Sequence, residues 1–118
     1  NPKPNSGAAA ADVLWHSGAT AGIAFNDMLA IGMLQRFIER GIKVPDDISI
    51  VGCDDIFGSD FCSPPLSTIS GPTNRVGREL TTLLLALIEG HELDRGSRVE
   101  LPVYLKLRGS TGPAPVRG

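Results

Sequence analysis

Two pairs of polar residues each follow a short apolar run, and they are the best candidates for chemistry in this chain. Asn26-Asp27 follows residues 20–25, and Asp54-Asp55 follows residues 48–53. Ligands of open α/β sheets bind beyond the carboxyl ends of the strands, so we expect both pairs to face one crevice. Carboxylates accept hydroxyl protons, and an amide both donates and accepts. This set suits a neutral, hydroxyl-rich ligand such as a sugar or a nucleoside.

The same residues also have purely structural interpretations. Asn26 or Asp27 is expected to cap the helix that follows, because either side chain can accept a hydrogen bond from the first helical turn. Asp54 can be an ordinary turn residue at a strand end, and Asp55 can cap a short turn. Asp46-Asp47 precedes a strand at the opposite edge of the sheet, which predicts a solvated turn.

Catalytic and metal-binding chemistry finds little support. The glycines form no phosphate-binding motif and the serines form no nucleophile elbow. Cys53 and Cys62 have the spacing of neither a redox pair nor a zinc site, so both are expected to be reduced; the acids after Cys53 should raise its thiol pKa. His16 and His91 are expected to be exposed. A magnesium site of the receiver or phosphatase type needs further acids and a well-placed lysine, which the sequence lacks. We therefore predict no enzyme, no cofactor and no metal.

Length and charge limit the remaining functions. The 118 residues are 42% hydrophobic, which fits one small domain or a piece of a larger protein. A net charge of −2 and a pI near 5.6 argue against direct binding of nucleic acid by this chain. The longest apolar stretches are shorter than a membrane span requires.

The predicted elements alternate between helices and strands. Helices are expected over residues 7–16, 27–40 and 74–89, and strands over residues 20–25, 48–53, 66–70 and 98–107. Buried strands alternating with helices of this length indicate parallel pairing with right-handed crossovers. Residues 1–6 are expected to form a linker, and residues 109–118 a flexible tail.

The apolar positions predict which helix faces are covered. In the first helix Ala9, Val13 and Trp15 are expected to point inward. Residues 28–34 are apolar nearly all round the helix, so this segment should meet both the sheet and a second subunit. The third helix carries an apolar stripe that predicts one buried face, made of Val76, Leu80, Leu83, Leu84, Leu87 and Ile88.

An ordered set of motifs resembles the LacI/GalR family of bacterial transcription regulators. Residues 41–52 read GIKVPDDISIVG, similar to the family's G-x-x-V-P-x-D-[IV]-S-[IV]-[IV]-G run, and the paired acids follow at Asp54-Asp55. Residues 20–32 resemble its TA…ND-x-x-A-x-G stretch. Residues 64–69 resemble PPLTT[IV], and residues 101–111 resemble the closing LP…L..R.ST. The resemblance covers residues 7–111.

This resemblance implies an α/β fold with a three-layer αβα parallel sheet of the type I periplasmic-binding-protein kind, present as a partial domain. Residues 7–70 would belong to the C-terminal lobe, and residues 71–108 would supply the hinge crossing, a final helix and strands shared with the N-terminal lobe. The implied function is the sensor and dimerisation part of a cytoplasmic repressor. That repressor would bind a small effector and change its operator affinity allosterically, touching DNA only through a helix-turn-helix absent from this chain.

The resemblance also implies roles for particular residues. Asn26 and Asp54 match positions that contact the effector. A homodimer or tetramer is implied, with an interface made of Asp27, Met28, Ile31, Leu34, Phe57, Phe61 and Cys62. Cys53 replaces a common aromatic residue, and Gly71 and Thr73 replace larger residues that often line the pocket, so the effector's identity stays open.

Two other functions compete with a regulator. A periplasmic sugar-binding protein of a transport system shares the two-lobed fold, and an enzyme of flavodoxin-like architecture shares the alternation of strands and helices. The run over residues 44–49 favours the regulator over both.

Overall fold

The computed structural model describes residues 6–91 and 98–116, and its elements follow the predicted order. Residues 1–5 of the predicted linker lie outside the described residues, and Ser6 already belongs to a helix. The elements are α1 (Ser6–His16), β1 (Ala21–Ile23), α2 (Asp27–Glu39), β2 (Ser49–Cys53), β3 (Ser67–Ser70), α3 (Thr73–Ile88) and β4 (Tyr104–Lys106).

The chain divides into two compact units. The first unit contains the residues up to Ser70 and those from Leu105 onward, and the second unit is Gly71–Tyr104. The sheet has the strand order β1-β2-β3-β4. β1, β2 and β3 are parallel, as predicted. Within the described ranges, no helix is long and apolar enough to cross a membrane.

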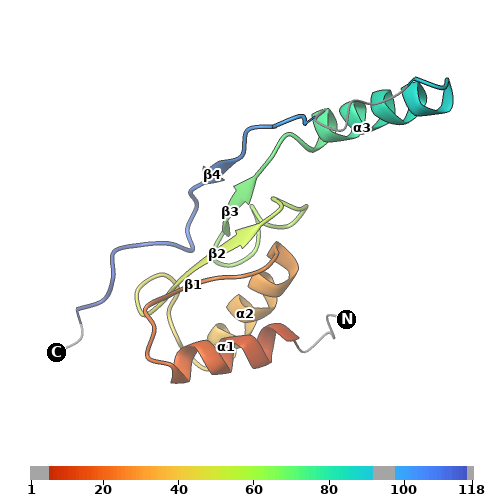
Figure 1. Ribbon diagram of the computed structural model, residues 1–118. Helices are drawn as coiled ribbons and strands as arrows, with labels where there is room; N and C mark the ends of the chain where they lie inside the picture. Colours follow the sequence, from red (N-terminus) through yellow and green to blue (C-terminus); the bar gives the residue numbers. More distant parts are fainter. Residues whose placement is uncertain (1–5, 92–97, 117–118) are drawn as a thin grey trace. The chain divides into compact units, whose positions relative to one another are not determined.

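Both helices of the first unit pack on one face of the sheet (Figure 1). Gly22 is paired with Ile50, and side chains alternate along a strand, so Gly22, Ile50 and Gly52 share that face. A Cβ built on Gly22 would meet Leu14 of α1, and one on Gly52 would meet Asp27 of α2. The apolar core fills this layer with Ala11, Ala24, Ala30, Met33, Leu34, Phe37, Ile48, Ile50 and Leu66.

At the point where Gly7 meets Gly32, the contact between α1 and α2 leaves no room for a side chain. A Cβ on Gly7 would lie 2.6 Å from the Cα of Gly32. The buried residues of α1 are Gly7 and Ala11, one turn apart, whereas Ala9 and Val13 are exposed. The prediction that Ala9 and Val13 point inward is therefore wrong, because the smallest residues of α1 form its close approach to α2.

Polar contacts fix both helices in place. Asp12 of α1 accepts hydrogen bonds from the guanidinium groups of Arg36, at 3.0 Å, and Arg40, at 2.8 Å. These partners lower the pKa of Asp12 and outweigh the opposing effect of its desolvation. At the start of α2, Asn26 Oδ1 accepts the N–H of Leu29 at 2.9 Å, which is the predicted cap. Trp15, as predicted, packs partly buried against the core.

The segment after β4 is held against the sheet. Ser110 is fully buried; its hydroxyl donates to the carbonyl of Ile50 at 2.6 Å and accepts the N–H of Ser67 at 2.8 Å. The Gly112 N–H donates to Ser49 Oγ at 3.1 Å. The predicted flexible tail is thus wrong for residues 109–112, because small hydroxyl side chains bind this segment to β2 and β3.

In the second unit, the apolar stripe of α3 is not buried. No residue of α3 is buried, and Leu80, Leu84 and Ile88 are each more than half exposed. The prediction of a buried face fails here because the pattern implies a covering partner that the described residues do not supply. The predicted strand region 98–107 contains one strand, β4, among its described residues.

Gly52 should tolerate no side chain. A Cβ there would overlap Asp27 Oδ1 and lie 2.9 Å from Leu66 Cδ2, so we expect Gly52→Ala to lower the free energy of unfolding by about 1–3 kcal/mol through overpacking. Gly77 of α3 is the matched control, since nothing lies within 4 Å of its built Cβ. Gly77→Ala should leave stability unchanged or raise it by up to about 1 kcal/mol. Equal losses in urea unfolding for both variants would contradict this packing.

Candidate functional site

Asn26 and Asp54 lie at equivalent places on the carboxyl edge of the sheet. Ile23 of β1 is paired with Val51 of β2, and each candidate residue stands three positions further along its strand direction. The pairing continues past β1, because the N–H of Ala24 donates to the carbonyl of Val51 at 2.8 Å. The structure therefore brings these two residues to the same edge.

Asn26 is half-buried, and capping uses one polar atom of its side chain. Its Oδ1 is used in capping α2. Its amide nitrogen can donate two hydrogen bonds, and it makes none to the residues that the structure describes. Asn26 can thus cap the helix and hold a ligand oxygen at the same time.

Asp54 is exposed and stands on an unusual backbone. Its φ is 103°, in the left-handed region that non-glycine residues seldom occupy. Its N–H donates to the carbonyl of Ile69 at 2.9 Å, which ties it to the end of β3. Its carboxylate contacts the thiol of Cys53 and forms no ion pair among the described residues, so it keeps acceptor capacity for a further hydrogen bond. Backbone conformations of this kind cluster at ligand sites.

Asp55 forms an ion-pair cluster instead of capping a turn. Its carboxylate accepts from Lys106 Nζ at 2.5 Å, Arg108 Nη2 at 2.6 Å and Ser70 Oγ at 3.1 Å. Hydrogen bonds from Lys106 and then Arg108 lower the pKa of Asp55 to about 2. The sequence contains one indication of this cluster. Lys106 and Arg108 are two residues apart, which places both side chains on one side of an extended chain.

Asp27 is an internal anchor with no exposed surface. Its carboxylate accepts from the N–H of Ile56 at 3.0 Å, Ser59 Oγ at 2.5 Å and Thr68 Oγ1 at 2.6 Å. Leu34 is 1% exposed and belongs to the core. The prediction that Asp27 and Leu34 face a second subunit is corrected by this burial, because neither side chain reaches the surface.

Three other residues of the predicted interface are exposed apolar side chains. Met28, Phe57 and Phe61 are 69%, 92% and 65% exposed, and the two phenyl rings meet edge to face at 5.0 Å. The hydrogen bonds of Asp27 hold this loop beside the first turn of α2. Ile31 and Cys62 lie half-buried and pack against the core.

The cysteines and histidines offer no reactive site. Cys53 and Cys62 are free thiols, and desolvation raises the pKa of both; the Asp54 carboxylate adds to the shift of Cys53, as predicted. His16 and His91 are exposed, as predicted. No cluster of metal-ligating side chains occurs in the part of the chain that the structure describes.

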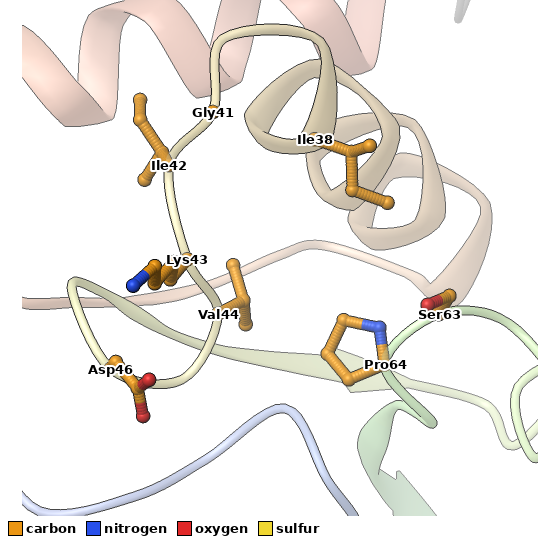
Figure 2. A pocket seen from close by; sticks show the side chains of 8 residues that line it. All are labelled: Ile38, Gly41, Ile42, Lys43, Val44, Asp46, Ser63 and Pro64. Carbon is orange, nitrogen blue, oxygen red and sulfur yellow. The ribbon is translucent and has the colours of Figure 1, made fainter.

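Two cavities of the first unit lie away from Asn26 and Asp54. One cavity of about 420 Å³ is formed by the turn before β2, the end of α2 and the loop before β3 (Figure 2). Its position is the amino edge of the sheet, opposite to Asn26 and Asp54. A second, mainly apolar cavity of about 510 Å³ lies between α1, β1 and α2. Neither is lined by Asn26 or Asp54, so a ligand held by these residues needs a further wall.

Comparisons with known proteins find a periplasmic binding protein-like domain and transcriptional regulators. A sequence model of the periplasmic binding protein-like domain matches residues 1–111. The HTH-type transcriptional repressor CytR of Escherichia coli (strain K12) is 42% identical over 96 residues, which are 81% of this chain and 28% of that protein. The chain thus spans less than a third of that relative.

Two solved structures extend the likeness. A LacI family transcriptional regulator from Arthrobacter sp. FB24, in complex with lactose, is 35% identical with a TM-score of 0.79, over 92% of this chain and 41% of that chain. The lac repressor dimer bound to operator is 33% identical with a TM-score of 0.76, over 89% and 37% respectively. These names agree with the predicted fold and resemblance, and with the prediction of a regulator in place of an enzyme.

The Asp55 cluster should contribute to stability in a pH-dependent way. Its folded pKa of about 2 is below its ordinary value of 3.8, so the contribution is complete above about pH 4 and is lost as the pH falls through 2. We expect Asp55→Asn to be less stable than the unchanged protein at pH 5, with a deficit that shrinks towards pH 2 in thermal unfolding. Asp60→Asn, an exposed acid of the same loop, is the control and should unfold like the parent. A deficit that is constant across this range would contradict the assignment.

Proposed function

The chain belongs to the family of periplasmic binding protein-like domains, and we propose that it forms the effector-sensing and dimerisation part of a LacI-family transcriptional repressor. The names of its relatives and structural neighbours support this proposal. Operator DNA would be bound by a helix-turn-helix outside this chain, in keeping with a net charge of −2. A protein with this role works in the cytoplasm, where its DNA is.

The observation that carries the proposal is the pairing of Asn26 and Asp54 at one edge of the sheet. The amide nitrogen of Asn26 donates and the carboxylate of Asp54 accepts, which together suit the hydroxyl groups of a sugar or nucleoside. The lactose complex of a structural neighbour supports a sugar-like ligand. The missing wall of the site would come from the N-terminal lobe, so that a bound effector contacts both lobes.

The mechanism follows from this two-sided contact. A ligand that touches both lobes binds most tightly to the lobe orientation in which all its contacts form, and it shifts the population towards that orientation. The dimer would carry the change to the DNA-binding heads. Coupling of this kind usually changes affinity about 5–150-fold.

The proposed dimer surface consists of Met28, Phe57 and Phe61, with Ile31 and Cys62 beside them. Exposed apolar clusters of this kind are typical of subunit contacts. The lac repressor dimer among the structural neighbours supports the same assembly. A periplasmic sugar-binding protein, the main rival, is not favoured, because the reported relatives are transcriptional regulators.

Loss of the Asp54 carboxylate should weaken effector binding. A hydrogen bond to a charged group contributes about 1.5–3 kcal/mol, so Asp54→Ala should raise the Kd about 10–150-fold. The measurement is calorimetric titration of the full-length protein with cellobiose, lactose and the four common ribonucleosides. Asp46→Ala, an exposed acid at the opposite edge of the sheet, should bind like the parent. An unchanged Kd for Asp54→Ala would remove Asp54 from the site.

Charges placed on the proposed dimer surface should separate the subunits. Met28→Asp and Phe61→Asp each bury a carboxylate in an apolar contact, which is unfavourable without a partner. Sedimentation velocity of the full-length protein should then show monomers. Val116→Asp changes a residue that is 98% exposed and should remain dimeric. Intact dimers for both surface variants would reject this interface.

A further inference from the structure

The Asp55 cluster joins both strands that connect the first unit to the second. Ser70 is the last residue of β3 before the chain leaves the first unit, and Lys106 lies just after the chain re-enters it at Leu105. Asp55 accepts hydrogen bonds from Ser70 Oγ on the outgoing strand and from Lys106 Nζ on the returning strand. One carboxylate therefore binds both connectors.

The cluster is more than a surface ion pair. The side chains of Asp55 and Arg108 are only 15% and 18% exposed. Arg108 also donates from Nη1 to the carbonyl of Leu66, and from its backbone N–H to Ser67 Oγ, both at 2.8 Å. Partly buried, charge-assisted contacts with several points of attachment restrain geometry far better than exposed pairs do. Arg108 thus binds the returning strand both to residues 66–67, at the start of β3, and to Asp55.

Asp55 also controls the backbone of its neighbour. Both Asp54 and Asp55 have positive φ, at 103° and 54°. Such conformations persist only where surrounding contacts impose them. The imposed contacts here are the N–H of Asp54 on Ile69, and the three side-chain partners of Asp55.

We propose that Asp55 is a positioning residue that couples the ligand-contacting Asp54 to the two connecting strands. Any displacement of Asp54 would pass through one peptide bond to Asp55, and from its carboxylate to Ser70, Lys106 and Arg108. The connectors would respond together because one group holds both. The ligand-dependent part of this inference rests on the proposed function; the restraint on the connectors does not.

Hydrogen exchange in the ligand-free, full-length protein tests the restraint. We expect Asp55→Asn to raise amide exchange in peptides covering residues 53–57, 67–70 and 104–108 at least about threefold more than in peptides from α1 and α2, where only the global loss of stability acts. Asp60→Asn is the matched control, since Asp60 is an exposed acid in the same loop, and it should change nothing. A uniform rise over the whole protein, or no rise in the connectors, would overturn the proposal.

A double-mutant cycle separates the cluster from a general loss of stability. Arg108→Gln should raise exchange in the same peptides, and the double variant with Asp55→Asn should show less than the sum of the two single effects, because both changes break the Arg108–Asp55 ion pair. Fully additive effects would show that the two residues act independently and would contradict the proposal.

A test of the coupling between Asp54 and the connecting strands requires a bound compound and operator DNA. For any compound among cellobiose, lactose and the common ribonucleosides that binds the unchanged protein, the Kd of Asp55→Asn is measured first, because releasing the backbone of Asp54 should weaken binding, and DNA affinity is then compared at a saturating concentration of the compound. The change in DNA affinity caused by the compound should fall to less than about twofold, from the 5–150-fold usual for such coupling. Unchanged coupling would overturn the proposal. If no compound binds, the proposed ligand class fails, and the exchange result still decides the restraint.

Discussion

One buried carboxylate holds together the segments on which the candidate site depends. Asp27 begins α2, and it accepts hydrogen bonds from Ile56 and Ser59 in the loop after β2 and from Thr68 in β3. An unpaired carboxylate with no exposed surface would cost several kcal/mol, and these three hydrogen bonds offset that cost. The missing side chain of Gly52 leaves the space that Asp27 fills.

The two polar pairs share one design. In each pair the first residue retains hydrogen-bonding capacity that the proposed ligand would use, and the second is fixed by internal contacts. Asn26 is followed by Asp27, which is bound within the core, and Asp54 is followed by Asp55, which is bound to the connecting strands. Asn26 and Asp54 are therefore positioned by neighbours that are themselves held by internal contacts. This arrangement gives a preorganised edge of the sheet.

The sequence was informative wherever the cause of a structure is local. The order of elements, the Asn26 cap and the parallel strands follow from residue patterns within a few positions, and the structure agrees with them. Features that depend on distant partners were missed. From its sequence neighbours alone, Ser110 was predicted to lie in a tail, whereas in the structure it is hydrogen-bonded to β2 and β3. Asp55 was likewise predicted to cap a turn, because its partner Arg108 is 53 residues away in the sequence. Likewise, the pattern of α3 predicts a buried face without naming what covers it.

In the proposed function, this chain is the part of a DNA-binding protein that binds a small hydroxyl-bearing ligand. The most direct measurement is the affinity of the full-length protein for a DNA duplex that it has selected from a random pool, with and without each sugar and nucleoside of the panel. We expect at least one neutral compound to change this affinity about 5–150-fold. Binding that is indifferent to DNA sequence and unaffected by every compound would contradict it.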